Sequence, residues 1–228
     1  MIINGFQKLT LLDFPSKVAC IVFTPGCNFK CPFCHNAALV THINAEDKMD
    51  PDDILSYLNS RKGLLEGVSI TGGEPLMQKG IKDFIKKVKD MGYSVKVDTN
   101  GTYPELLMEL VNEKLVDYVA MDIKNNKQNY AKTAGVDSVD LQNIQKSISF
   151  LLEGRVDYEF RTTVVDGYHT VDTIADIAEW IKGAKKYYLQ NFKDSGDTIQ
   201  KNLKSVPENT LNLMQQTAQN RLVPTFIR

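Results

Sequence analysis

Short runs of β-branched and other apolar residues alternate along the chain with longer amphipathic stretches. The short runs predict six strands, over residues 17–24, 67–71, 94–98, 117–122, 157–165 and 185–191. The longer stretches predict helices over residues 51–61, 80–91, 104–113, 141–152, 170–181 and 207–220. Because runs such as Ala19–Phe23 are continuously apolar, their strands are expected in a parallel sheet that is covered on both faces. The pattern therefore predicts an α/β fold of six βα units, either doubly wound or barrel-shaped.

The chain is expected to form one domain. Its 228 residues contain no sequence repeat, low-complexity tract or long linker. We divide it into an N-terminal extension over residues 1–16, the six βα units over residues 17–191, and a C-terminal helix and tail over residues 192–228. Within the extension, Gly5–Pro15 is expected to cover the bottom or the edge of the sheet.

Composition narrows the class of protein. Hydrophobic residues make up 43% and charged residues 24% of the chain, and the formal net charge is −1 without a long run of one sign. This balance gives no support to a nucleic-acid or membrane-surface partner. The N-terminus lacks a basic region followed by an apolar core, and no apolar run approaches the roughly 20 residues of a membrane span. We expect a cytoplasmic protein.

Polar residues gather directly after four of the predicted strands. In parallel βα folds the loops that leave the carboxyl ends of the strands meet at one face, where ligands bind. These four segments are therefore expected to build one site: the cysteines after the first strand, residues 72–75 after the second, 98–101 after the third and 122–124 after the fourth.

The four cysteines, Cys20, Cys27, Cys31 and Cys34, all lie in one short stretch. Such crowding in a chain of this length favours metal or redox chemistry over a disulfide framework. The run CNFKCPFC at residues 27–34 lets three sulfurs converge on a small inorganic centre, whereas a structural zinc site takes four ligands. A cubane cluster on three cysteines leaves one iron open to a small molecule with an amine and a carboxylate.

Two other interpretations of the cysteines stay open. One is a zinc site that adds His35 or Cys20 to the three cysteines, and the other is a catalytic thiol. Because His35 is adjacent to Cys34, tetrahedral ligation of one ion by both would be strained. Cys20 lies within an apolar strand and is more naturally a buried small hydrophobe. We favour the cluster, held by Cys27, Cys31 and Cys34.

The CxxxCxxC pattern, with the aromatic Phe33 before the last cysteine, resembles the signature of the radical S-adenosylmethionine (SAM) superfamily. Companion features follow in order, so the resemblance covers nearly the whole chain. It implies a partial (β/α)6 barrel in which SAM binds the free iron of a [4Fe-4S] cluster. One-electron reduction would cleave SAM to methionine and a 5′-deoxyadenosyl radical, which takes hydrogen from the substrate. No catalytic residue is expected beyond the cluster and SAM.

The resemblance also implies SAM contacts at the strand ends. The run TGGEP at residues 71–75 resembles the GGEP motif that binds the SAM amino group, with Gly72 and Gly73 admitting close backbone approach. Glu74 is expected as a charge partner in or near the site. The run DTNG at residues 98–101 is by itself an Asx turn, but it resembles the strand end that meets SAM in glycyl-radical activating enzymes, which places Asn100 there.

Charged residues complete the expected set. Asp122 and Lys124 match the family's Asp-Leu-Lys segment with isoleucine in the middle, and Lys124 is the candidate contact for the SAM carboxylate. The resemblance implies that Asp98 and Asp122 jointly hold a monovalent cation, with simple hydrogen bonding as the alternative. Arg161 is expected to contact either SAM or a carboxylate in the barrel, since an unpaired buried arginine is costly.

The remaining candidates are less central. Gln190 is expected near the adenine of SAM, and Phe33 and His35, on either side of Cys34, join the SAM-binding set. Three further residues are assigned to the surface or to packing: His42, His169 and Trp180.

Three segments, residues 5–15, 23–36 and 188–192, resemble the activating proteins of anaerobic ribonucleotide reductases. That family installs a glycyl radical on a partner enzyme and takes its electron from a flavodoxin-like or ferredoxin-like donor. The chain differs from pyruvate formate-lyase activases in lacking an Asp-Gly-Pro-Gly segment before the first strand. The alternatives are a small-molecule radical SAM enzyme similar to deazapurine synthases, and a non-catalytic iron-sulfur or zinc-binding module.

Overall fold

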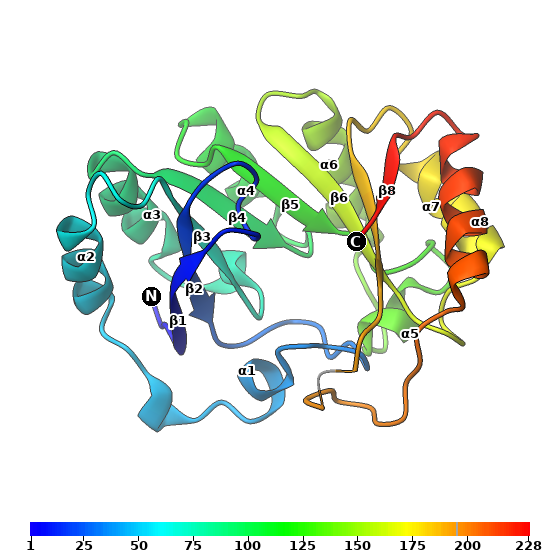
Figure 1. Cartoon of the computed structure of the whole chain (residues 1–228), viewed down its shortest axis with the longest axis horizontal. Coiled ribbons are helices and arrows are strands. Elements are labelled where there is room, and N and C mark those ends of the chain that lie inside the picture. Colours follow the sequence, from blue (N-terminus) through cyan, green and yellow to red (C-terminus); the bar gives the residue numbers. More distant parts are fainter. Residues whose placement is uncertain (195) are drawn as a thin grey trace.

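A computed structural model describes residues 1–194 and 196–228. Its centre is one curved sheet in which eight strands follow each other in chain order (Figure 1). The first strand pairs antiparallel with the second, and all later pairs are parallel. The strands are β1 (Gly5–Thr10), β2 (Ala19–Thr24), β3 (Gly67–Gly72), β4 (Ser94–Thr99), β5 (Tyr118–Asp122), β6 (Asp157–Val164), β7 (Tyr187–Asn191) and β8 (Thr225–Ile227). The predicted α/β partial barrel is confirmed.

Helices cover the outer side of the curved sheet, with α2 and α8 at its two ends (Figure 1). The helices are α1 (Ala37–Thr41), α2 (Pro51–Ser60), α3 (Ile81–Asp90), α4 (Pro104–Asn112), α5 (Tyr130–Ala134), α6 (Leu141–Leu152), α7 (Val171–Trp180) and α8 (Glu208–Gln219). Two short 3-10 helices, η1 (Ala45–Asp47) and η2 (Pro75–Met77), lie in loops. All six helices and all six strands expected from the sequence are present. None of the helices in the described residues combines the length and apolar character that crossing a membrane requires.

Besides the two 3-10 helices, two strands and two α-helices were not expected from the sequence pattern. Strand β1 lies at the sheet edge with its middle residues exposed, so it has no apolar run to reveal it. Strand β8 has three residues, and helices α1 and α5 have five each, which is too short for a helical period to appear. The extension therefore adds a strand to the sheet edge, and the C-terminal tail adds another.

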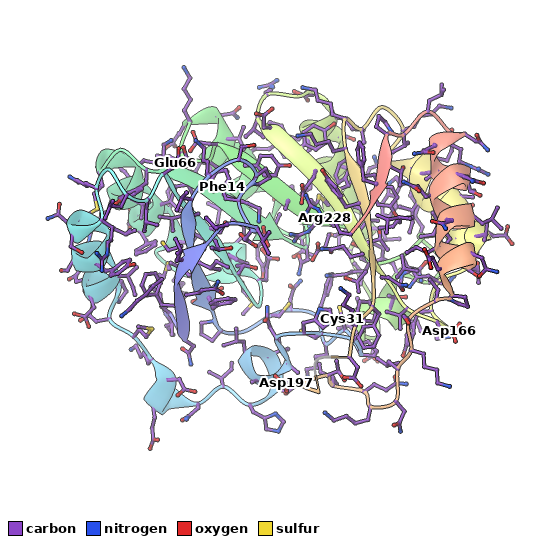
Figure 2. The ribbon with its side chains drawn as sticks, in the orientation of Figure 1. Phe14, Cys31, Glu66, Asp166, Asp197 and Arg228 are labelled. Carbon is purple, nitrogen blue, oxygen red and sulfur yellow. The ribbon has the colours of Figure 1, made fainter. Side chains whose placement is uncertain are left out.

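The amino end of the barrel, where the parallel strands begin, is filled by the segment after β1, and in Figure 2 Phe14 of this segment lies at the opposite end of the strands from Cys31. Phe14 forms a small buried cluster with Ala19 and Tyr118, the first residues of β2 and β5. A Cβ on Gly67, the first residue of β3, would lie 2.8 Å from the Phe14 ring. Within the described residues β1 and β8 do not pair with each other, so the barrel stays open along one side.

Candidate functional site

A cavity of about 230 Å³ opens at the carboxyl ends of the parallel strands. It brings together residues from the loops after β2, β3, β4 and β5 and from strands β6 and β7, as the strand-end argument predicts. Every residue of the expected cluster and SAM set lines it except Glu74. The expected residues in its wall are Cys27, Cys31, Phe33, Cys34, His35, Gly72, Gly73, Asp98, Asn100, Asp122, Lys124, Arg161 and Gln190.

The loop that carries the three cysteines is held from both sides. Lys30 N donates to Ala134 O of α5 at 2.9 Å, and a Cβ on Gly135 would lie only 2.0 Å from Lys30 O. On the other side Gln200 N donates to Pro32 O at 2.8 Å, so the segment after β7 runs beside the cysteine loop. Figure 2 shows Cys31 in this region, below the strands.

Burial sets the state of the thiols. Cys31 is buried, and Cys27 and Cys34 are partly exposed. Desolvation raises the pKa of Cys27 to about 12 and that of Cys31 to about 11, and it also raises the pKa of Cys34. Without a bound cation these groups are therefore neutral thiols, and binding of iron has to displace their protons.

Cys20 stands apart from the other three cysteines. It is fully buried in β2 within the main hydrophobic core, and it is not among the residues of the cavity wall. Its environment is that of a small apolar side chain, as the apolar strand around it suggests.

The three thiols that line the cavity fit a cluster better than a single ion. In the described part of the chain, no three His, Cys, Asp or Glu side chains gather closely enough to hold one metal ion. Zinc–sulfur bonds of about 2.3 Å would require sulfurs about 3.8 Å apart. A cluster instead binds each cysteine to a different iron. Tyr130 of α5 is fully buried outside the cavity wall, and its hydroxyl finds no hydrogen-bond partner among the described residues.

Gly72 and Gly73 join the end of β3 to the start of the cysteine loop. Gly73 N donates to Thr24 O and Glu74 N donates to Gly26 O, both at 2.8 Å. Gly72 has φ +120°, and a Cβ there would lie 2.3 Å from Thr24 O. A Cβ on Gly73 would lie 1.9 Å from Gly26 O. Only glycine permits this approach, and it leaves backbone atoms of both residues in the cavity wall.

Glu74 lies beneath the cavity rather than in its wall. Its carboxylate accepts hydrogen bonds from Leu76 N at 3.1 Å, from Thr99 Oγ1 at 2.8 Å and from Asn100 N at 2.7 Å. Burial raises the pKa of Glu74 to about 7, while these three donors oppose the shift. In this structure Glu74 ties the loop after β4 to the loop after β3. Asn100 in turn donates to Asn28 Oδ1 at 2.8 Å, which reaches the cysteine loop.

Four charged groups form a connected array in the cavity wall. Arg161 donates from Nε to Asp122 at 2.8 Å and from Nη1 to Asp98 at 3.2 Å. Lys124 Nζ lies 2.9 Å from the second oxygen of Asp122. Burial is the largest single influence and by itself would raise the pKa values of both carboxyl groups. The charge of Arg161, together with Lys96 at Asp98 and Lys124 at Asp122 and their hydrogen bonds, outweighs it, and both pKa values are lowered. Arg161 thus pairs with carboxylates, one of the two roles expected for it.

Aromatic and histidine side chains hold this wall in place. His35 stacks on Phe192 with ring centroids 5.7 Å apart, and its Nε2 lies 3.0 Å from Lys193 O. Phe33 packs edge-on against Tyr168 and His169. His169 is buried, and its Nε2 lies 2.8 Å from Lys124 O, so this packing histidine also fixes the backbone of Lys124.

The remaining two residues assigned to surface or packing lie outside the cavity. Nδ1 of the exposed His42 lies 2.7 Å from Thr41 Oγ1. Trp180 packs edge-on against Tyr130 and donates to Gln145 Oε1.

Sequence reasoning missed several residues that shape the site. Lys96 is the most unexpected, since a lysine in a buried strand gives no motif. The available signal was spacing, because Lys96 lies two residues before Asp98 and therefore on the same face of β4. Polar side chains that share the cavity wall or brace it were also not singled out: Asn28, Asn36, Thr71 and Thr99.

Comparison with known proteins identifies the class. Residues 21–181 match the model of the radical SAM superfamily, and the chain belongs to that superfamily. It is accordingly an enzyme whose cofactors are a [4Fe-4S] cluster and SAM. In overall shape it is similar to the crystal structure of a radical SAM methyltransferase from Sphaerobacter thermophilus, with a TM-score of 0.75 and 14% identity over 96% of this chain and 68% of the other.

Relatives in sequence are more specific. A protein of Methanocaldococcus jannaschii named "Putative glycyl-radical enzyme activating enzyme" is 33% identical, over all of this chain and 95% of its own length. The pyruvate formate-lyase-activating enzyme of Clostridium pasteurianum is 24% identical over 85% of this chain and 83% of its own length. Both similarities extend well beyond the cysteine loop.

The contact at Gly73 yields a prediction about stability. Replacing Gly73 by Ala places a Cβ against the Gly26 carbonyl, and we expect the free energy of unfolding to fall by about 3 kcal/mol or more. Urea denaturation of the apoprotein measures this. Gly183→Ala is the matched control, because Gly183 has φ +94° with nothing within 4 Å, so only backbone strain of about 1 kcal/mol is added. Equal losses in both variants would contradict the packing argument.

Proposed function

We propose that this protein is a glycyl-radical activating enzyme that works in the cytoplasm on an anaerobic ribonucleotide reductase. The observation that carries the proposal is that three cysteines and the charged residues Asp98, Asp122, Lys124 and Arg161 line one cavity at the strand ends. The full-length similarity to an activating enzyme of M. jannaschii supports the reaction class. The reductase as partner is supported by the sequence resemblance of residues 5–15, 23–36 and 188–192.

In this proposal Cys27, Cys31 and Cys34 hold the cluster. When bound and reduced by an external one-electron donor, the [4Fe-4S] cluster would supply the electron for cleavage of SAM to methionine and a 5′-deoxyadenosyl radical. Transfer of a hydrogen atom from a glycine of the partner then gives 5′-deoxyadenosine and leaves the unpaired electron on that glycine. The chain's contribution is to bind and orient both reactants and to exclude water.

The cavity wall offers complementary groups for each part of SAM. Backbone atoms at Gly72 and Gly73 are accessible to its amino group, and the Lys124 ammonium, 18% exposed, is available to its carboxylate. Asn100, Arg161 and Gln190 face the same space. Phe33 and His35 keep the wall rigid through the ring contacts described above.

Two of the segments that resemble the reductase activases meet at the site. His35, just after the cysteine loop, stacks on Phe192, just after β7. Through this contact residues 23–36 and 188–192 position each other, which explains why both segments contribute to the resemblance to reductase activating proteins. The cavity opens at the carboxyl ends of the strands, and a loop of the macromolecular partner is inserted there in this proposal. The electron would come from a flavodoxin-like or ferredoxin-like donor.

The cluster assignment yields a prediction about the cysteines. Replacing Cys27, Cys31 or Cys34 by Ala should abolish the electron paramagnetic resonance signal of the reduced cluster after anaerobic reconstitution, because each removes one iron ligand. Cys20→Ala should retain the signal, since that thiol is not in the cavity wall. Loss of the signal in Cys20→Ala would show that the ligand set is incomplete.

A second prediction concerns Lys124. Replacing Lys124 by Ala should weaken SAM binding by about 10- to 150-fold without lowering the iron content, because a charge-assisted contact is worth about 1.5–3 kcal/mol. Isothermal titration of reconstituted protein with SAM measures the affinity. Lys82→Ala serves as a control, since Lys82 pairs with glutamates on the outer helices. Unchanged affinity in the Lys124 variant would reject its role.

The proposed reaction is tested directly with the partner. Reconstituted protein, dithionite, SAM and purified anaerobic ribonucleotide reductase should yield a glycyl radical signal and 5′-deoxyadenosine, detected by paramagnetic resonance and chromatography. The control is a reductase in which the radical-bearing glycine is replaced by alanine, which should give no glycyl signal. Pyruvate formate-lyase is assayed in parallel. If SAM is cleaved but the glycyl radical forms on pyruvate formate-lyase and not on the reductase, the proposed partner is rejected and the reaction class is retained. The absence of 5′-deoxyadenosine under every condition would overturn the reaction itself.

A further inference from the structure

The two carboxylates expected to share a monovalent cation are already engaged by cations of the chain. Lys96 Nζ lies 2.5 Å from Asp98 Oδ1, and Arg161 Nη1 lies 3.2 Å from Asp98 Oδ2. Arg161 Nε lies 2.8 Å from Asp122 Oδ1, and Lys124 Nζ lies 2.9 Å from Asp122 Oδ2. A bound sodium or potassium ion needs oxygen ligands from the protein. Lys96, Arg161 and Lys124 between them contact all four carboxylate oxygens, with Arg161 bridging the two aspartates, so an ion would have to displace one of these side chains and the residues do not fit it.

Lys96 is the member of this array that faces away from the solvent. The Lys96 side chain is 1% exposed, and its ammonium lies between the carboxylates of Asp98, on the same strand, and Asp13, at 3.1 Å. Asp13 comes from the segment that fills the barrel where the parallel strands begin. The neighbouring Val95 and Val97 point to the other side of β4, into the hydrophobic core. The Lys96 ammonium therefore approaches Asp98 from the amino ends of the strands, on the side opposite to the cavity.

The charges of the ion-paired array that contains Asp98 and Asp122 are balanced without an added ion. The array contains three carboxylates, Asp13, Asp98 and Asp122, and three cationic side chains, Lys96, Arg161 and Lys124. A monovalent cation placed between Asp98 and Asp122 would be a surplus charge beside Lys96 and Arg161. Repulsion between like charges is strong where water is excluded, so the balanced array disfavours the ion.

We propose that Lys96 supplies from within the chain the positive charge that would otherwise be contributed by a monovalent cation, so that SAM binding requires neither sodium nor potassium. Lys96 acts as a positioning residue, because it is not part of the cavity wall and works through Asp98. Asp98 and Asp122 together hold the Arg161 guanidinium at the wall. The inference rests on the proposed SAM site, whose charged wall Lys96 completes.

The native protein provides the first test. SAM affinity of the reconstituted protein is measured by isothermal titration in potassium chloride, in sodium chloride and in tetramethylammonium chloride at equal ionic strength. We expect dissociation constants that agree within about twofold, since salt then acts only by screening. Binding that is about tenfold tighter in potassium or sodium would overturn the inference while leaving the SAM site intact. No SAM binding in any of the three salts would overturn the proposed site and the inference with it.

The second test removes the internal cation. Lys96→Met keeps most of the side-chain volume and leaves Asp98 with a free oxygen. In tetramethylammonium chloride we expect SAM binding to weaken about tenfold, and potassium chloride to restore it, because the ion can now enter beside Asp98. Lys89→Met is the matched control, since Lys89 also pairs with an aspartate, Asp117, at 2.7 Å but away from the cavity. If potassium chloride does not restore SAM binding in Lys96→Met, the proposal that Lys96 takes the place of a monovalent cation is rejected.

The apoprotein gives a readout that needs neither the cluster nor SAM. Potassium chloride should raise the melting temperature of the Lys96→Met apoprotein relative to tetramethylammonium chloride, because an ion that binds only the folded state stabilises it. The native and Lys89→Met apoproteins should show no such difference. A potassium-dependent rise in the native apoprotein would overturn the inference. Should Lys96→Met not fold, the comparison of salts with the native protein decides the question alone.

Discussion

Backbone hydrogen bonds across strand ends give the cysteine loop its shape, and the site depends on them. Gly26 N donates to Leu39 O at 2.7 Å, and the carbonyls of Thr24 and Gly26 accept from Gly73 and Glu74. These contacts involve main-chain atoms only, so they position the loop whatever its side chains are. Close approach of two backbones requires the absence of a Cβ, which is why the glycine pair lies opposite the start of the cysteine loop.

Alternating charge is the second constraint on the site. An unpaired charge in the interior of a barrel is costly. Here the buried charges form a continuous series of ion pairs, from Asp13 at the amino ends of the strands to Lys124 at the cavity. Removal of one side chain from this series would leave its partner as an unpaired buried charge, which the neighbouring groups of the same sign would repel. The ion pairs therefore link the packing at the amino ends of the strands to the electrostatics of the cavity wall at their carboxyl ends.

Much of the fold was predictable because the core strands are buried on both faces. Residues 67–71 and 117–122 are apolar enough to be recognised, and the structure extends or trims them by one residue. Edge strand β1 escaped prediction because exposure removes the apolar pattern. Helix α5, which supports Lys30 and buries Tyr130, escaped because five residues are fewer than two helical turns. The elements that brace the cysteine loop were thus the least visible in the sequence.

The sequence by itself determined the residue types of the site and their order along the chain. Three cysteines at fixed spacing favour an iron-sulfur cluster, because thiolates are its ligands. The glycine pair after the next strand and the charged residues after later strands indicate a SAM site only through their resemblance to the radical SAM superfamily. Only the tertiary structure decided which charges pair. The Glu74 carboxylate lies behind the cavity wall and accepts three hydrogen bonds. Lys96 pairs with Asp98 on the side away from the cavity. Such pairings depend on distances between strands far apart in sequence, and these distances exist only once the sheet has curved into a barrel.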